Sequence, residues 1–376
     1  MHHIVIVGGG FAGVWSAASA ARVRGDAAIR ITLVSPGTDL VLRPRLYEAE
    51  PERALVPLKR ILEPVGVEHV QATVTEIDTA GRRVVTGDGE VLAYDRLVLA
   101  TGSQLIRPQL PGAERVFDVD TLDGAVALRD HLRGRTGFTA VVVGAGFTGL
   151  EVATELAGRG RVILADRSAV VGPELGDGPR PAIEAALDRL GVERRLGTTV
   201  TEVKDGSVRW ADGTWSEADA VIWTAGLRAS PLTAHVEGPR DRLGRLEVDA
   251  RLRVSPDVFA AGDTAAARLD AGHVTVQSCQ YAVPMGRTAG HNAAADLLGL
   301  PLIDFAPGPY VTDIDLGGAG AVFTRGWDRR VESTGADGKL VKQWIMEKIH
   351  PPVDDAEEIL NAAAYVYVVI PGAREL

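Results

Sequence analysis

Short apolar runs, each followed by glycines and then by a stretch with helical spacing of its apolar residues, recur along this chain. Ile4 to Val7 and Val141 to Val143 have the continuous apolar character of buried parallel strands. The residues after the glycines, Val14 to Arg24 and Leu150 to Arg159, are expected to form helices. The pattern therefore predicts an α/β fold in which parallel strands alternate with helices.

The two glycine-rich turns are copies of one motif, G-x-G-x-x-G, placed about 136 residues apart. The first glycine permits a tight turn, the second lets the backbone approach a pyrophosphate, and the third lets helix and strand pack closely. The phosphates lie at the positive N-terminus of the helix. Two copies in this context predict two bound dinucleotides. We call these two glycine-rich motifs the first and the second cradle. The expected binding residues are Gly8, Gly10, Phe11, Ala12 and Gly13 in the first cradle, and Gly144, Gly146, Phe147, Thr148 and Gly149 in the second.

The second strand of each unit should end in a residue that holds the adenosine ribose. In the first unit, the strand predicted over Ile29 to Val34 ends at Ser35, and a serine hydroxyl binds a ribose more weakly than a carboxylate does. Asp39, in the loop that follows, is an alternative source of the acid.

In the second unit, the strand predicted over Arg161 to Ala165 ends at Asp166, at the expected spacing of about 20 residues past the cradle. The charge of Asp166 would repel the 2′-phosphate of NADPH, so we expect NADH to be preferred. Arg167 is adjacent and could soften this preference.

The rest of the second half repeats the order of the first. Each half should contain an antiparallel insertion around an Asp-Gly turn, followed by a buried strand that ends in small residues. The strands expected in the first half are Val70–Val74, Val84–Thr86 and Val91–Tyr94, then Tyr94–Ser103; those in the second half are Thr199–Val203, Ser207–Trp210 and Glu217–Ala220, then Ala220–Gly226. The repeat predicts two homologous nucleotide-binding units.

The run Val258 to Asp263 has the character of a last strand that returns to the first unit. We therefore predict two Rossmann-like domains, the second inserted in the first, plus a small C-terminal α+β region. The predicted domains are residues 1–108 with 240–305, residues 109–239, and residues 306–376. In the third region, paired strands (Tyr310–Gly318 and Gly320–Thr324) and a helix (Leu340–Ile349) are expected, with Trp327 and Trp344 as packing residues.

Charge and composition exclude several classes of partner. The formal net charge is -10, and no run of Lys and Arg offsets it, which argues against nucleic acid or an anionic membrane as the main partner. The first strand begins near residue 3, so no signal peptide is expected, and the expected location is the cytoplasm. Ala362 to Ile370 is too short to span a membrane and is interpreted as a packed terminal strand.

Cys279 is the only cysteine, which excludes a redox-active Cys-x-x-Cys pair, a cysteine-based metal cluster and a disulfide within the chain. It is either a small buried hydrophobe or a functional thiol near a cofactor. The eight histidines are scattered without metal-binding spacing, so no metal site is expected.

Together these motifs resemble the two-dinucleotide flavoproteins, the pyridine nucleotide-disulfide oxidoreductase-like proteins that bind FAD and NAD(P), and most closely the type II NADH dehydrogenases. Pro44, Leu46 and Tyr47 match their loop after the second strand, and Gly149-Leu150-Glu151 matches their second cradle. The resemblance implies that the first cradle holds FAD and the second holds NADH, with NADPH a poorer ligand. Further cofactor-binding residues that it implies are Arg43, Ala100, Thr101, Gly102, Ala225, Gly226, Gly262 and Asp263.

Some features depart from the type II pattern. Gln280 and Gly286 match part of its glutamine-rich quinone stretch, but Pro284 stands where a second glutamine is usual. The chain also stops at Leu376, before the longer C-terminal segment of that family. The single cysteine argues against a sulfide:quinone reductase and excludes a thioredoxin-reductase type.

The resemblance implies that NADH passes a hydride to FAD and that a quinone or similar two-electron acceptor then takes the electrons. Glu151 would face the nicotinamide or flavin, or it is only an acid favoured by the helix dipole. Gln280 would lie near the flavin pyrimidine or the acceptor, or it only starts a helix. The C-terminal region would cover the flavin or form a homodimer surface, and peripheral membrane contact is possible.

Two other functions keep the same cofactors. The chain could reduce a small iron–sulfur protein or act as a biosynthetic tailoring flavoenzyme. It could also be a redox-sensing protein that binds FAD and NADH and reports their state to a partner.

Overall fold

The computed structural model describes residues 1–364 and 370–372 of the 376 residues. The terminal strand expected over Ala362 to Ile370 lies mostly outside the described residues, and Ala362 itself is the last residue of helix α8 (Ala356–Ala362). Among the residues that are described, no helix is long and apolar enough to cross a membrane.

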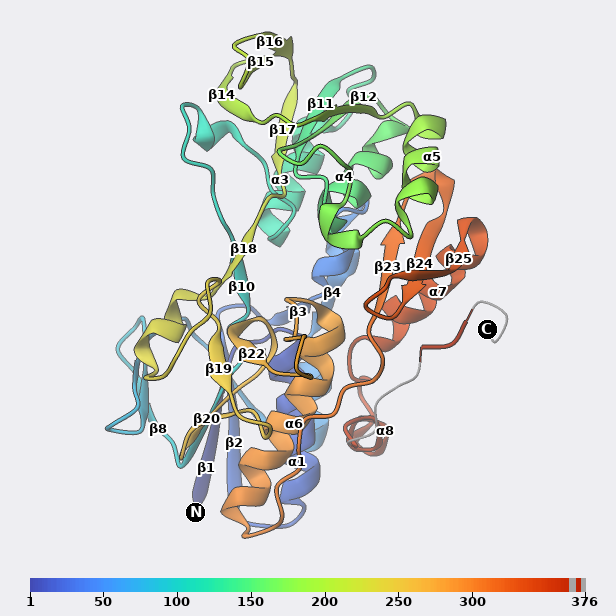
Figure 1. Ribbon diagram of the computed structural model, residues 1–376. Coiled ribbons are helices and arrows are strands. Elements are labelled where there is room, and N and C mark those ends of the chain that lie inside the picture. The colour runs from blue at the N-terminus through green and yellow to red at the C-terminus, as the bar shows by residue number, and fades with distance from the viewer. Residues whose placement is uncertain (365–369, 373–376) are drawn as a thin grey trace.

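A six-stranded sheet in the order β20-β21-β9-β1-β2-β5 carries the first cradle (Figure 1). Its neighbouring strands pair in parallel except for the edge pair β20 and β21. The return strand expected at Val258 is confirmed, because β21 pairs with β9. The strands are β1 (His2–Val7), β2 (Ile29–Ser35), β5 (Glu68–Gln71), β9 (Arg96–Leu99), β20 (Arg253–Ser255) and β21 (Val258–Ala260).

A four-stranded parallel sheet in the order β13-β12-β11-β17 carries the second cradle. All of its strands lie between β9 and β21 in the chain, so one sheet is built from a segment inserted into the other. The predicted α/β class with two Rossmann-like units is confirmed, whereas the exact domain boundaries stay predictions. The strands are β11 (Thr139–Val143), β12 (Arg161–Asp166), β13 (Glu193–Leu196) and β17 (Ala220–Trp223).

Both antiparallel insertions are present, but two of the expected strands were placed wrongly. Val70 belongs to β5, which pairs in parallel with β2, and the antiparallel strand begins only at Val74. In the second insertion the third strand is Trp215–Glu217, because Ala220 already starts β17. The strands are β6 (Val74–Asp78), β7 (Arg83–Thr86) and β8 (Val91–Ala93), then β14 (Val200–Lys204), β15 (Ser207–Trp210) and β16 (Trp215–Glu217).

Two long helices, α1 (Phe11–Arg24) and α6 (Cys279–Leu297), lie side by side against the first sheet (Figure 1). They approach closely because Gly286 and Gly290 of α6 have no side chains. A Cβ at Gly286 would overlap the backbone carbonyl of Ala12, and a Cβ at Gly290 would overlap that of Ser16. The hydroxyl of Ser16 donates to the Gly286 carbonyl across this contact (3.1 Å).

The chain crosses between the two units at a pair of antiparallel strands, β10 (Ser103–Leu105) and β18 (Leu227–Ala229). The second unit contains α3 (Leu122–Leu132), α4 (Phe147–Ala157) and α5 (Arg180–Leu190). Smaller elements of the first unit are β3 (Asp39–Val41), β4 (Leu55–Pro57), α2 (Lys59–Leu62), β19 (Leu246–Val248) and β22 (Ala265–Ala267).

The C-terminal region is a three-stranded antiparallel sheet with helix α7 (Gly335–Lys348) against it. The expected strand pair is present as β23 (Val311–Asp315) and β24 (Ala321–Arg325), whereas β25 (Arg330–Thr334) was missed. Trp327 packs as expected, stacked on Tyr310 and His273 with ring centroids 4.1 and 4.2 Å away, and Trp344 is half-buried.

Candidate active site

The first cradle is closely packed on one side and open on the other. Gly8 has φ +116°, and a Cβ there would overlap the Ala100 carbonyl, while a Cβ at Gly13 would overlap the Gly8 carbonyl. Gly10, the residue before α1, has no heavy atom within 4 Å of the place its Cβ would take. The backbone and helix N-terminus are thus accessible at Gly10, which fits a pyrophosphate.

Ser35 lies at the end of β2 as expected, but its hydroxyl is already bonded. It donates to the Gly37 carbonyl (2.9 Å) and lies 3.0 Å from Nε2 of His69. Burial lowers the pKa of His69, so this imidazole is neutral at neutral pH. The carboxylate of Asp39 accepts from the neighbouring hydroxyl of Thr38 (2.7 Å). His69 is a candidate residue of the ribose-binding region at the end of β2, and sequence reasoning missed it.

Several residues implied by the resemblance converge beside the first cradle. Arg43 donates to Ser103 Oγ (3.1 Å) and lies 3.7 Å from the Asp263 carboxylate, which also accepts from Ser103 (2.6 Å). Arg43 also pairs with Asp120. Gly262, at φ +71°, packs directly on Ala12 of the cradle. A Cβ added to Gly262 would lie only 2.9 Å from the Cβ of Ala12.

Two buried hydroxyls in this region, of Thr101 and Ser278, have no hydrogen-bond partner among the described residues. Thr101 stands between Ala100 and Gly102 after β9, and Ser278 precedes α6. Buried hydroxyls are normally bonded, so this pair fits a polar ligand such as FAD. Sequence reasoning missed Ser278, which a search for residues at helix starts would have found.

The second cradle has the same closely packed side. Gly144 has φ +114°, and a Cβ at Gly149 would overlap the Gly144 carbonyl. The hydroxyl of Thr224, just after β17, donates to the carbonyls of Val143 and Gly144 (3.1 Å each). Ala225 and Gly226 follow, with Trp223 Nε1 donating to the Ala225 carbonyl (3.2 Å).

Asp166 lies at the end of β12, directly beside this cradle. Its carboxylate accepts from the backbone N–H of Ala145 (2.8 Å) and of Ser168 (2.7 Å). Two backbone donors hold the carboxylate in a fixed position, which suits a group that accepts ribose hydroxyls. Its role in selecting NADH stays a prediction.

The open side of the second cradle differs from that of the first. Gly146 corresponds to Gly10, but a Cβ at Gly146 would overlap the carboxylate of Glu174. Glu174 belongs to the loop after β12, and Phe147 and Thr148 at the start of α4 are half-buried and exposed. Glu174 is a third residue that sequence reasoning missed.

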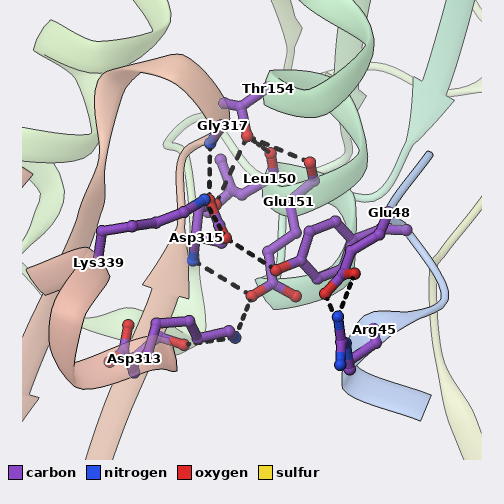
Figure 2. A network of polar contacts seen from close by, with 11 residues as sticks. Arg45, Glu48, Leu150, Glu151, Thr154, Asp313, Asp315, Gly317 and Lys339 are labelled. Atoms are coloured by element: carbon purple, nitrogen blue, oxygen red, sulfur yellow. Dashed lines mark hydrogen bonds and ion pairs between the residues drawn. The ribbon is translucent and has the colours of Figure 1, made fainter. Parts of the chain in front are cut away.

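Glu151 lies one turn into α4, and its carboxylate is buried (Figure 2). It accepts from Lys342 Nζ of α7 (2.7 Å) and from the backbone N–H of Asp315 (3.2 Å). Burial raises the pKa of Glu151, with Lys342 acting against this. Burial would lower the pKa of Lys342, but the carboxylates around it outweigh burial and raise it. The two groups form a buried ion pair.

The same network reaches the first unit through Tyr47. Its hydroxyl donates to Asp315 Oδ2 (3.0 Å), and Lys339 Nζ lies 2.5 and 2.6 Å from the two oxygens of that carboxylate. Asp313 is different, because both its carboxylate oxygens are buried without a partner among the described residues. Burial raises the pKa of Asp313 to about 7. The Glu151 and Asp315 carboxylates are therefore each paired with a lysine, whereas the Asp313 carboxyl group is buried without a partner among the described residues.

Gln280 starts α6, and both ends of its amide are bonded to the C-terminal region. Nε2 donates to the Pro309 carbonyl (3.1 Å), and Oε1 accepts from the N–H of Val311 (3.4 Å). Its role at the flavin or acceptor stays a prediction. Burial raises the pKa of the neighbouring Cys279 thiol to about 11, so the reactive thiolate is scarce at neutral pH. Cys279 is half-buried, and the raised pKa argues against a functional thiol.

Comparisons with known proteins agree with this geometry. The chain is 47% identical to an NADH dehydrogenase-like protein of Mycobacterium tuberculosis, over 97% of this chain and 98% of that protein. It is 30% identical to a type II NADH:quinone oxidoreductase of the same species, over 70% and 67% of the two chains. The solved sulfide:quinone oxidoreductase of Aquifex aeolicus has the same fold, with a TM-score of 0.75, 19% identity and coverage of 93% and 92%.

The family model described as pyridine nucleotide-disulphide oxidoreductase matches residues 2–286, which include both cradles and the start of α6. The family expected from the motifs is therefore confirmed. This chain belongs to the pyridine nucleotide-disulphide oxidoreductase family.

Proposed function

We propose that this chain is an FAD-dependent NADH dehydrogenase that passes electrons to a quinone or a similar two-electron acceptor. The family supports an enzyme that binds a pyridine nucleotide, and relatives named NADH dehydrogenase-like protein and NADH:quinone oxidoreductase support the donor and the acceptor. A membrane quinone would be met at the membrane surface, so the proposal includes peripheral attachment on the cytoplasmic side. A homodimer remains a prediction.

The first cradle fits FAD, because Gly10 is open and the hydroxyls of Thr101 and Ser278 lack partners among the described residues. Gly8 to Gly13 would hold the pyrophosphate. Asp263, fixed by Arg43 and Ser103, would bind the hydroxyl-bearing chain between the phosphates and the ring. When bound, FAD supplies the chemistry, because it takes a hydride from NADH and releases two electrons to an acceptor.

The second cradle and Asp166 would hold NADH by its phosphates and ribose. Glu151 then lies on the helix that begins at this cradle, and its pairing with Lys342 fixes its direction. A fixed, buried ion pair can orient polar groups of the two nucleotides without reorganising. Asp313, whose pKa burial raises to about 7, would exchange a proton near this pair at neutral pH.

One observation carries the proposal. Side chains from the two nucleotide units meet in a single buried network, in which Glu151 from the second unit and Tyr47 from the first both contact Asp315. A hydride can pass between two nucleotides only if their rings are in contact. A shared network at the junction supports the proposal because it holds the two nucleotide units against each other.

The test is an anaerobic titration of the purified yellow protein, followed by its visible spectrum. We expect stoichiometric NADH to bleach the flavin band, NADPH to do so only at higher concentration, and a soluble quinone to restore the band. A protein that retains no flavin, or a flavin that NADH leaves oxidised, would contradict the proposal. Reoxidation by a small iron–sulfur protein but not by quinone would assign a different acceptor, and reoxidation by neither would favour the redox-sensing function.

A further inference from the structure

The two cradles offer a comparison within one chain. At Gly10 the space above the backbone is empty, whereas at the corresponding Gly146 it holds the carboxylate of Glu174. In this motif the second glycine is where the backbone approaches the pyrophosphate. A negatively charged group of the protein itself therefore occupies the position of the ligand's negative charge.

The backbone around Glu174 is fixed on both sides. The N–H of Gly172 donates to the Ala145 carbonyl of the cradle (2.9 Å), and the Glu174 carbonyl accepts from Arg329 Nη2 (3.1 Å). Arg329 is buried, and its guanidinium lies over the Tyr310 ring, 4.4 Å from the centroid. A residue of the C-terminal region thus holds the loop in place over the second cradle.

The side chain of Glu174, in contrast to its backbone, is free to leave. The residue is exposed, so its carboxylate can turn into solvent while the loop backbone stays in place. The N-terminus of α4 attracts a carboxylate, which explains why the side chain lies there. A pyrophosphate in the same place would be repelled until the carboxylate moves.

We propose that Glu174 is an internal occupant of the pyrophosphate position in the second cradle, that NADH must displace it in order to bind, and that it thereby sets the affinity of this site. The inference rests on the proposed function, because it takes the second cradle as the NADH site. The carboxylate lowers the affinity for every ligand that carries this pyrophosphate. It leaves the flavin-reduction step unchanged once NADH is bound.

The test compares the FAD-loaded wild type with Glu174→Gln and with a matched control, Asp177→Asn. Asp177 is an exposed acid of the same loop that pairs with Arg180 rather than facing the cradle. Binding of ADP-ribose, which has the pyrophosphate but no nicotinamide, is measured by calorimetry at low and high salt. The rate of flavin reduction at saturating NADH is measured in parallel.

We expect Glu174→Gln to tighten ADP-ribose binding about 5- to 10-fold at low salt, with Asp177→Asn within about 2-fold of wild type. The gain should shrink as salt rises, because salt screens the repulsion that is removed. The saturating rate should not change. Equal or weaker binding by Glu174→Gln would overturn the proposal while normal reduction by NADH keeps the proposed function. Absence of ADP-ribose binding in every variant, together with a flavin that NADH leaves oxidised, would overturn both.

Discussion

At Gly10 the absence of a side chain matters for ligand binding and not for folding. Its φ of -81° is one that any residue adopts, and nothing lies within 4 Å of the place where a Cβ would point. The protein itself therefore does not need a glycine at this position. A ligand that contacts the backbone here would need a residue without a side chain. A substitution at this position therefore tests binding without disturbing the fold.

We expect Gly10→Ala to fold normally and to lose FAD. The unfolding free energy of the flavin-free protein should change by less than about 1 kcal/mol, since no contact is disturbed. The flavin-to-protein ratio after purification should fall to near zero, because the methyl group takes the place of the pyrophosphate. Gly37→Ala, in a loop with nothing closer than 3.9 Å, is the control and should keep its flavin. Full flavin content in Gly10→Ala would contradict the first cradle as the FAD site.

Asp313 should make stability depend on pH. Folding raises its pKa from 3.8 to about 7, so the folded protein holds this proton more tightly than the unfolded chain does. The stabilisation is complete below pH 4 and is lost as pH rises through 7, by about 4 kcal/mol at most. Relative to Asp313→Asn, wild type should therefore lose thermal stability between about pH 4 and 7.

The thermal midpoints of both proteins, compared at each pH, isolate this contribution. Asp337→Asn, which removes an exposed acid from the first turn of α7, is the matched control and should parallel wild type. A constant difference between wild type and Asp313→Asn across this range would show that Asp313 does not titrate there.

At the scale of elements, the contact between α1 and α6 depends on backbone rather than on side chains. The first cradle lies at the start of α1, so the position of α6 also supports the flavin site. Gly290 is the tightest point, because a Cβ there would overlap the carbonyl of Ser16. Interiors packed at this density respond to a single added carbon.

We expect Gly290→Ala to lower the unfolding free energy by about 1–3 kcal/mol and to reduce flavin content, because the two helices must move apart. Gly158→Ala, at the end of α4, is the matched control: its φ is -72° and nothing lies within 4 Å. That change should be neutral or stabilise by about 0.4–1 kcal/mol. Urea unfolding of both variants measures the difference, and equal stabilities would contradict the tight contact.

Elements with continuous apolar runs could be predicted from the sequence, and those that depend on distant pairing could not. The strands before both cradles were found because β-branched runs followed by glycines have few other interpretations. Val70 was assigned to the wrong strand because its partner, Val34 of β2, is set by tertiary structure. The edge strand β25 has a single apolar residue, Val331, and gave no local signal.

The candidate site shows the same division. Cradle glycines and Asp166 follow from local motif spacing, which one sequence displays. Lys342 could not be found as the partner of Glu151, because the two are 191 residues apart and a lysine on a helix is ordinarily exposed. Glu174 was missed because its relevance depends on a loop folding back over Gly146.

At the scale of the whole molecule, the buried pair of Glu151 and Lys342 ties the second unit to the C-terminal region. Removing one partner leaves the other charge buried and unpaired. Lys342→Met should therefore cost about 3–5 kcal/mol of unfolding free energy, and the double variant Glu151→Gln with Lys342→Met should recover much of this. Urea unfolding of the single and double variants measures the coupling.

Lys339→Met is the control on the same helix, since the Lys339 side chain is 34% exposed where it pairs with Asp315. Its cost should be smaller than that of Lys342→Met, because the Asp315 carboxylate keeps the hydrogen bonds from Tyr47 and from the N–H of Gly317. Additive effects of the two changes in the double variant would show that Glu151 and Lys342 do not depend on each other.

The insertion of one sheet within the other also sets an order of events on the ribosome. β9 is made early, but β21, its neighbour in the sheet, follows about 160 residues later, and α6 later still. At 5–20 residues per second this delay is roughly 10–30 s. In that time the whole inserted unit is synthesised and can fold, while the edge of β9 and the glycine-contacting face of α1 stay uncovered. We therefore expect chaperones to bind mainly at this stage of synthesis, when the first unit is incomplete.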